Sequence, residues 1–94
     1  ATKAGVGAYT TYLAVELASR GIRVNNVAPG VIRAPMSPSM ALVSGGEESS
    51  AAQAILNRIG EPEEVAEVVE FLLSERASFI TAQTILVDGG FVAR

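Results

Sequence analysis

The pattern of hydrophobic positions begins with a stripe that has helical spacing. Near the N-terminus, apolar residues recur at intervals of three and four, which places them on one face of a helix: Val6, Tyr9, Leu13 and Leu17. We therefore expect a helix over residues 1–19. Gly21 suits the end of this helix, because glycine readily adopts the left-handed conformation that closes one. Glycines and alanines make the rest of its surface small, so another helix or strand is expected to approach it closely.

Two short apolar runs have the composition of β-strands. Residues 22–28 are apolar and rich in β-branched side chains, as a buried strand requires. Pro29 has no N–H group to donate to a sheet, so the strand must end about there. Residues 84–87 have the same character, and Asp88-Gly89-Gly90 ends that run. Ligands of open α/β sheets bind beyond the carboxyl ends of the strands, so the turn after Pro29 is the first place to seek a function.

Between the two runs the sequence changes from loop-like to helical. Residues 31–50 are rich in proline, glycine and serine, and an interval of this length inside a compact domain is more often functional or mobile than inert. A short helix is expected over residues 51–58. A longer helix is expected from Pro62 to about Ser74, because proline fits the first helical position and glutamates favour the first turn.

The predicted order is helix, strand, loop, two helices and strand. Helical connections between strands imply a parallel sheet, whose strands need neighbours and cover on both faces. Two strands do not meet that requirement, since so small a sheet is marginal by itself. The pattern therefore predicts an α/β fold that is incomplete in this chain, with residues 1–94 forming the carboxyl-terminal segment of a larger α/β domain.

Composition and charge narrow the functional classes. The 94 residues are 49% hydrophobic, carry a formal net charge of −3, and have their seven basic residues scattered singly. The absence of a basic patch argues against nucleic acid as a partner, and no apolar run is long enough for a membrane span. With no cysteine and no histidine, thiol chemistry and the usual zinc or serine-triad sites are excluded, and no metal site is expected. A cysteine-free chain with no visible targeting segment is expected to be cytoplasmic.

Three groups of residues together resemble the short-chain dehydrogenase/reductase family, and they occur in the family's order. They are Lys3…Glu16-Leu17-Ala18…Gly21-Ile22-Arg23-Val24-Asn25…Pro29-Gly30, then Arg58-Ile59-Gly60-Glu61-Pro62-Glu63-Glu64-Val65-Ala66, and then Phe71-Leu72-Leu73-Ser74…Ile80-Thr81…Val87-Asp88-Gly89-Gly90. The resemblance implies a Rossmann-type doubly wound parallel sheet, of which this chain is the C-terminal portion, within a single NAD(P)-binding domain. It also implies an enzyme that transfers a hydride between NAD or NADP and an alcohol or carbonyl carbon.

The resemblance gives Lys3 a catalytic and cofactor-binding role. Lys3 matches the lysine of the family's Tyr-x-x-x-Lys signature, whose tyrosine would lie two residues upstream of Ala1. Residues four apart share one helix face, and an ammonium group beside a tyrosine lowers the pKa of the phenol, which then acts as general acid or base. In the family this lysine also binds the nicotinamide ribose. Outside the family register, Lys3 would be interpreted as a solvated lysine on a helix surface.

The same resemblance places further residues near the cofactor and the substrate. The nicotinamide end of the pocket would be lined by Pro29, Gly30, Val31 and Ile32. In the interval 31–50, Met36 and Met40 could contact substrate, since methionine is soft and adaptable; packing of a lid is an equally good interpretation. Because this interval has few directional groups, the expected substrate is a small or hydrophobic alcohol or ketone.

Four residues depart from the surrounding pattern or from the family. Ala34 stands where the family commonly has a threonine that helps to hold the cofactor, and Ala82 stands where it usually has the glycine of Thr-Gly-Gln. Asn25 and Asn26 are polar residues within an apolar run, and their amides are expected to join neighbouring segments.

Three kinds of function remain open. In the first, the full-length protein is an enzyme and this chain alone is inactive, because the family's glycine-rich phosphate turn, serine and tyrosine are not among its residues. In the second, the chain is a non-catalytic fragment or part of a pseudoenzyme that acts in oligomer association, through the small-residue helix 1–19 and the edge strand 84–87. A free-standing helical interaction module is a weaker third alternative. The resemblance implies a homodimer or homotetramer.

Overall fold

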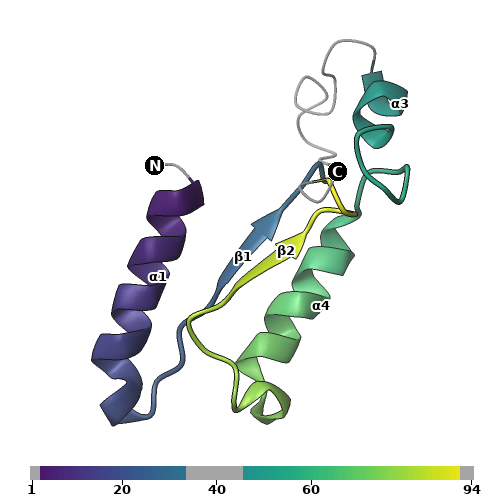
Figure 1. Cartoon of the computed structure of the whole chain (residues 1–94). Coiled ribbons are helices and arrows are strands. Elements are labelled where there is room, and N and C mark those ends of the chain that lie inside the picture. Colours follow the sequence, from purple (N-terminus) through teal and green to yellow (C-terminus); the bar gives the residue numbers. More distant parts are fainter. Residues whose placement is uncertain (1–2, 34–45, 92–94) are drawn as a thin grey trace. The chain divides into compact units, whose positions relative to one another are not determined.

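Two parallel strands and the helices around them make up the fold (Figure 1). The computed structural model describes residues 3–33 and 46–91. The order of elements is α1 (Lys3–Leu17), η1 (Ala18–Arg20), β1 (Asn26–Pro29), α3 (Gly46–Ala51), α4 (Pro62–Leu73), η2 (Glu75–Ala77) and β2 (Thr84–Val87). β1 and β2 are neighbours in a two-stranded sheet. Asn26 N–H donates to Gln83 O (2.8 Å), and Gly30 N–H donates to Val87 O (2.9 Å). The residue numbers of the two strands increase together from the first bond to the second, so the strands are parallel. The predicted α/β class with parallel strands is confirmed.

By their contacts the residues form two compact units. The first comprises Ala1–Val27 and Val68–Ile85, and the second comprises Ala28–Glu67 and Leu86–Arg94. Each unit therefore holds one half of the strand pair, and α4 is likewise divided between them. Among the described residues, no helix has the length and apolar character needed to cross a membrane.

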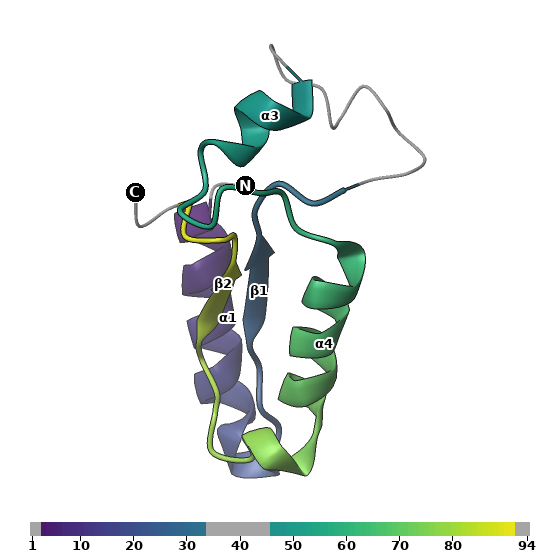
Figure 2. The same cartoon turned by 90° about the vertical axis from the view of Figure 1, so that its right-hand side faces the viewer.

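In the first unit, α1 approaches the sheet through small residues. Thr10 and Ala14 are buried, at 6% and 3% exposure. A Cβ atom added to Gly7 would lie 3.7 Å from the Oγ1 atom of Thr84 on β2, which shows how near the helix comes to the strand. Within this unit, the strands lie between α1 and the last part of α4 (Figure 1), and α1 lies behind the strands when the view is turned (Figure 2). Small side chains on the inner face of α1 permit this approach.

The predicted apolar stripe of α1 is not its buried face. Tyr9, expected on the stripe, is 63% exposed, and Val6 is also exposed, whereas Leu13 is half-buried. The spacing identifies the helix correctly, but the close approach to β2 selects small residues for the inner face. The helix continues as η1 and closes where expected: Gly21 is left-handed, with a φ of 73°, and its N–H donates to Ala18 O at 2.9 Å.

β1 is shorter than the sequence predicts, spanning Asn26–Pro29 instead of residues 22–28. Just before the strand, the side chain of Asn25 makes hydrogen bonds in place of main-chain pairing. The Asn25 amide donates through Nδ2 to Ile80 O and accepts the Gln83 N–H through Oδ1, both at 3.0 Å. These bonds confirm that Asn25 joins neighbouring segments, and they explain why the strand begins later than its apolar run.

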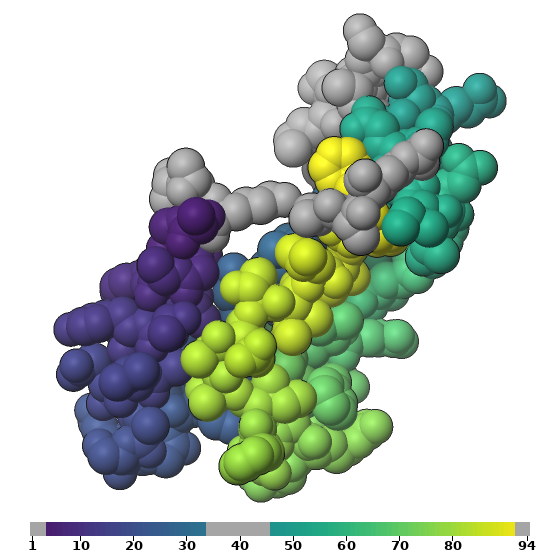
Figure 3. Space-filling view, viewed as in Figure 1, coloured from purple at the N-terminus to yellow at the C-terminus, as the bar shows by residue number. Residues whose placement is uncertain are grey.

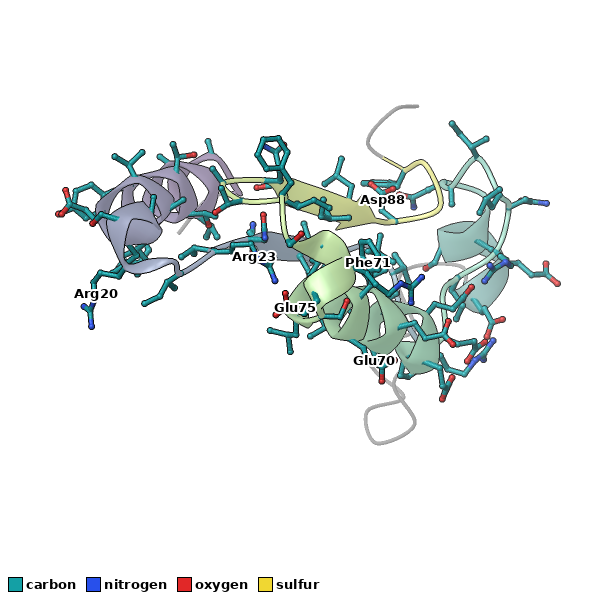
Figure 4. The ribbon with its side chains drawn as sticks, turned by 90° about the horizontal axis from the view of Figure 1, so that it is seen from below. Arg20, Arg23, Glu70, Phe71, Glu75 and Asp88 are labelled. Atoms are coloured by element: carbon teal, nitrogen blue, oxygen red, sulfur yellow. The ribbon has the colours of Figure 1, made fainter. Side chains whose placement is uncertain are left out.

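Arg23 binds the carboxyl end of α4. Its Nη2 atom donates to the carbonyl oxygens of Leu72 (2.8 Å) and Ser74 (3.3 Å), and its Nη1 atom donates to Ile80 O (3.1 Å). Figure 4 shows the labelled side chain reaching from the segment before β1 toward the end of the helix. The guanidinium thus faces the last carbonyls of α4, where the helix dipole favours a positive charge. One side chain joins three segments of the first unit.

Ala82 has a left-handed backbone, with a φ of 63°. This conformation strains a residue that carries a Cβ atom by about 1 kcal/mol, whereas glycine adopts it freely. The Ala82 N–H donates to Val24 O at 2.8 Å, so the pairing of these two segments holds the residue in place. The left-handed backbone at this position therefore explains why the family usually has a glycine here.

In the second unit, the helix predicted over residues 51–58 is wrong. The helix here is α3, Gly46–Ala51, and turns follow it. Asn57 is left-handed, with a φ of 58°, which no continuing helix allows. Leu56 N–H donates to Gly89 O at 3.0 Å. A bond to a residue far along the chain therefore replaces the local helical bond, and local sequence does not reveal it.

α4 begins at Pro62 and ends at Leu73, as predicted. The Glu64 carboxylate accepts the Glu61 N–H through Oε1 at 2.9 Å. This is the reciprocal half of a capping box, in which the third helical residue satisfies a free N–H at the helix start. Proline at the first position and the glutamate cap together explain why the sequence predicts the start of this helix.

Candidate functional site

The candidate site lies beyond the carboxyl ends of β1 and β2, in the second unit. After Pro29 the chain passes through a bend at Val31 into a short extended segment at Ile32. Gly60 N–H donates to Val31 O, and Arg33 N–H donates to Gly60 O, both at 2.9 Å. Ile32 thereby forms an isolated parallel bridge with Gly60. The segment expected to be a turn is therefore held in place by main-chain pairing.

Gly30 lies where two backbones approach each other closely. A Cβ atom at this position would be 2.8 Å from both the Cα and the Cβ atoms of Asp88. No real Cβ contact is that short, and a backbone has little freedom to move away. A close approach at this glycine is thus present, but the neighbour is Asp88 of the same chain.

A cavity of about 420 Å³ adjoins this extended segment. That volume is within the range of small-molecule pockets in proteins. The described lining comes from the segment after β1, from α3 and the turns that follow it, and from the end of β2: Val31, Ile32, Ser50, Ala54, Ile55, Leu56, Arg58, Gly60, Glu64, Leu86, Val87, Asp88, Gly89, Gly90 and Phe91. In the space-filling view, the yellow residues after β2 lie against the teal residues after α3 (Figure 3). Most of this lining is apolar, with a few polar groups.

Two of those polar groups form a bidentate ion pair. Arg58 Nη1 and Nη2 each donate to one oxygen of the Glu64 carboxylate, both at 2.8 Å. The hydrogen bonds from Arg58, and next the N–H of Glu61, lower the pKa of Glu64 to about 2. The same pairing raises the pKa of Arg58. At neutral pH the cavity rim thus carries a fixed carboxylate whose charge is compensated by its neighbour.

Ser50 supplies a buried hydroxyl beside the cavity. The residue is 2% exposed, and within the described part of the chain its Oγ atom has no hydrogen-bond partner. An unsatisfied buried hydroxyl destabilises a fold by about 1–3 kcal/mol. Nothing in the spacing of the sequence distinguishes Ser50 from its neighbours, because its burial depends on how α3 packs.

The structure describes the surroundings of only some of the predicted site residues. Val31 and Ile32 line the cavity, and Pro29 is exposed at the end of β1. Lys3 is the first residue of α1, but its side chain lies outside the described part of the structure. The predicted substrate contacts Met36 and Met40 also lie outside the described residues, as does Ala34.

The sequence pattern did not single out several residues around the cavity. Asp88, Gly89 and Gly90 were predicted only to end a strand, yet they line the cavity. Gly89 and Gly90 are left-handed, with φ values of 62° and 87°, and a Cβ atom on Gly90 would lie 2.8 Å from Ile55 Cδ1. The glycine pair itself was the available signal, since adjacent glycines mark a chain that bends tightly against a neighbour.

With this geometry established, comparison with known proteins identifies the family. A family model described as enoyl-(acyl carrier protein) reductase matches residues 1–92. The 3-oxoacyl-(acyl-carrier-protein) reductase FabG of Thermotoga maritima is 48% identical over 92 residues, covering 98% of this chain and 37% of that protein. This chain belongs to the short-chain dehydrogenase/reductase family. The suspected resemblance is thereby confirmed.

Two further matches support the assignment. The (S)-acetoin-forming diacetyl reductase of Staphylococcus aureus is 41% identical over 98 residues, covering 95% of this chain and 38% of that protein. The crystal structure of a short-chain dehydrogenase family protein from Francisella tularensis superposes with a TM-score of 0.88 at 33% identity, covering 98% of this chain and 42% of that one. The Rossmann-type fold class is confirmed, and the short-chain dehydrogenase/reductase chain spans little more than a third of the length of these curated relatives.

Proposed function

We propose that residues 1–94 are the C-terminal segment of a single NAD(P)-binding Rossmann domain, with the substrate interval near residues 31–50. The full-length protein is then an oxidoreductase that transfers a hydride between NAD or NADP and an alcohol or ketone. The observation that carries this proposal is the family match over residues 1–92. It is joined by a ligand-sized cavity at the carboxyl ends of two parallel strands, where α/β sheets bind ligands.

The extended segment fits a nicotinamide carboxamide, which has one hydrogen-bond acceptor and a pair of donors. In an extended chain, successive peptide groups point to opposite sides. Val31 O and Arg33 N–H face Gly60, so the N–H and C=O of Ile32 face the other side. A donor and an acceptor three bonds apart on one residue match an amide, and a bound nicotinamide would supply the carbon that gives or takes the hydride. Pro29, Gly30, Val31 and Ile32 are the proposed wall, and Ile32 is its hydrogen-bonding member.

For Lys3 we propose the role that the family implies. Its ammonium group lowers the pKa of an upstream tyrosine and binds the nicotinamide ribose, so that the tyrosine exchanges a proton with the substrate oxygen. An alcohol or ketone substrate is supported by the names of the relatives, one a 3-oxoacyl reductase and one a diacetyl reductase. The mostly apolar lining of the cavity favours a substrate with an apolar part. Met36 and Met40 are proposed to contact that part.

The test compares the full-length protein with the 94-residue chain. We expect NADH or NADPH to bind the full-length protein, and no measurable binding by the 94-residue chain, which has no phosphate-binding glycine turn. Micromolar binding by the short chain would contradict the proposal that it is a segment of the binding domain. In the full-length protein, Lys3→Ala is expected to lower kcat by about 10²-fold or more. Arg20→Ala is the matched control, since it removes another cation, at an exposed position at the end of η1, which continues α1. Equal activity of the two variants would remove Lys3 from catalysis.

Association with further copies is a second proposed property, and a specific observation supports it. On α1, three large side chains are strongly exposed: Tyr9, Tyr12 and Val15. Exposed apolar groups gathered on one helix commonly mark an interface. We propose a homodimer or homotetramer that uses this surface. Sedimentation of the full-length protein tests it: Tyr12→Glu with Val15→Glu should dissociate the oligomer, and an unchanged sedimentation coefficient would exclude this helix as the interface.

A further inference from the structure

Arg33 is the residue that directly follows the proposed nicotinamide wall. Its guanidinium binds two carboxylates from different segments of the second unit. Nη1 and Nη2 donate to the two oxygens of Glu47 at 2.8 and 3.1 Å. Nε donates to Oε2 of Glu61 at 3.1 Å and to Oε1 at 3.3 Å. Such a fork-to-carboxylate arrangement uses the planar geometry of arginine, and a lysine could not reproduce it.

The two carboxylates stand at structurally informative places. Glu47 belongs to the first turn of α3, fourteen positions after Arg33. Glu61 immediately precedes α4 and follows Gly60, the residue that pairs with the main chain of Val31 and Arg33. The Arg33 main chain and side chain therefore bind the same short segment, and the side chain adds α3 to it.

The ion pairs of this cluster shift the pKa values of Arg33 and Glu47. Hydrogen bonding by Arg33 lowers the pKa of Glu47. The hydrogen bonds that Arg33 donates to Glu47, and next those to Glu61, raise the pKa of Arg33. All three side chains are roughly half-exposed, at 45%, 49% and 43%. An isolated exposed pair contributes little to stability, but a cluster on one guanidinium restrains several segments at once. We therefore expect the cluster to affect the positions of these segments more than the stability of the fold.

We propose that Arg33 is a positioning residue: by joining Glu47 of α3 to Glu61 before α4, it fixes Val31 and Ile32 and sets the shape of the cavity they line. The inference rests on the proposed function in so far as that cavity receives the apolar part of a substrate. Its structural half does not depend on any ligand. Ser50 and Ala54, which also line the cavity, belong to α3 and to the turn after it, so a shift of α3 changes the cavity directly.

Glu48 provides a matched control. It is the next residue in the same turn of α3, has the same chemistry, and is exposed. No ion pair of Glu48 occurs among the residues that the structure describes. Glu47→Gln and Glu48→Gln therefore remove the same charge from the same helical turn, but only the first removes a partner of Arg33.

The first measurement is amide hydrogen exchange in the full-length protein without ligand. The reporters are the N–H groups of Arg33 and Gly60, which make the two wall-fixing bonds. We expect Arg33→Gln and Glu47→Gln to speed their exchange about fivefold or more, Arg33→Lys to have an intermediate effect, and Glu48→Gln to have none. If Glu47→Gln and Glu48→Gln exchange alike, Arg33 does not position the wall.

The second measurement is the KM for two ketones that differ in the length of their apolar part. With 2-butanone and 2-octanone as probes, Arg33→Gln should raise KM about fivefold for the longer ketone and by less for the shorter one, because a change in the shape of the cavity affects the longer apolar part more. An unchanged KM alongside faster exchange would overturn the link to substrate binding. Absence of NADH and NADPH binding by the wild-type protein would instead overturn the proposed function, while the exchange result would still decide the positioning role.

Discussion

Gly30→Ala is the substitution for which the structure gives the sharpest expectation. The added methyl group would lie 2.8 Å from the Cα and Cβ atoms of Asp88 and 3.4 Å from its carbonyl oxygen. Carbon atoms pack best at about 3.5–4.0 Å, so the overlap with each carbon is about 0.7–1.2 Å. Relief requires the ends of the two strands to separate, and this opposes the bond from Gly30 N–H to Val87 O.

The magnitude follows from two opposing contributions. Overpacking of this kind typically destabilises a fold by about 1–3 kcal/mol. Alanine also has a less disordered unfolded chain than glycine, which offsets about 0.4–1 kcal/mol where the backbone is compatible. Gly30 has no left-handed strain to add, since its φ lies outside the positive region. We therefore expect Gly30→Ala to lower the free energy of unfolding by about 1–2 kcal/mol.

Two other glycines serve as controls. A Cβ atom on Gly60 would meet Ile32 Cδ1 at 2.7 Å, but that atom is the end of a flexible side chain and can turn away, so the change should be within about 0.5 kcal/mol. A Cβ atom on Gly21 meets nothing within 4 Å, but its φ of 73° strains alanine by about 1 kcal/mol. The expected order of destabilisation is Gly30, Gly21, Gly60.

The assay is urea unfolding of the full-length variants without cofactor, with equal m values taken as the check that the compared states are the same. Asp88→Gly removes one of the two closest contacts together with the bond that its carboxylate accepts from Gly90 N–H, so it should cost less stability in the Gly30→Ala background than in the wild type. If Gly30→Ala is as stable as Gly60→Ala, the close approach of the Asp88 backbone is not what requires a glycine at position 30.

Three further predictions concern single side chains. Arg23→Met should lower the free energy of unfolding by about 2–3 kcal/mol, because it removes three hydrogen bonds to carbonyls at and beyond the end of α4; a loss no larger than that of Arg20→Met would exclude the capping role. Ser50→Ala should be stabilising by about 1 kcal/mol in thermal unfolding, since it removes an unpaired buried hydroxyl; a loss of stability would show that the hydroxyl has a partner. Glu64 has a folded pKa of about 2, below its usual 4.5, so the stability it contributes is present above about pH 5 and is lost as the pH falls toward 2. The stability difference between wild type and Glu64→Gln should shrink through that window, and a difference independent of pH would contradict the ion pair with Arg58.

The sequence is most informative where a feature is encoded by neighbouring residues. The start of α4 follows from Pro62 and from Glu64, which caps the helix through a bond to a residue three positions earlier. The end of the first helical segment follows from Gly21 alone. The end of β1 follows from the missing N–H of Pro29. Each of these depends on chemistry within a few residues, so a single sequence is sufficient to predict it.

The errors all arise where a distant segment decides the outcome. Residues 52–58 have a helical composition, but Leu56 bonds to Gly89 and the helix is lost. The inner face of α1 is chosen by the approach of β2, which favours Thr10 and Ala14 over the larger Tyr9. The cavity walls have the same origin, since α3 and the end of β2 meet only in the folded chain. Periodicity records which residues are apolar, but it does not record how closely their neighbours will pack.

Gly30 shows why a motif residue is poor evidence for the function of the motif. Its match to the family sequence is part of what implies a nicotinamide pocket, yet the contact with Asp88 requires a glycine whether or not a cofactor binds. Loss of activity in Gly30→Ala would therefore follow from either cause. The main chain of Ile32 gives a more direct test of cofactor binding. Its pairing with Gly60 leaves an N–H and a C=O on the opposite side, and the described contacts of the fold do not use them. A nicotinamide-dependent shift of the Ile32 amide resonance, retained in a Gly30→Ala protein that is still folded, would separate the structural requirement for this segment from its role in binding.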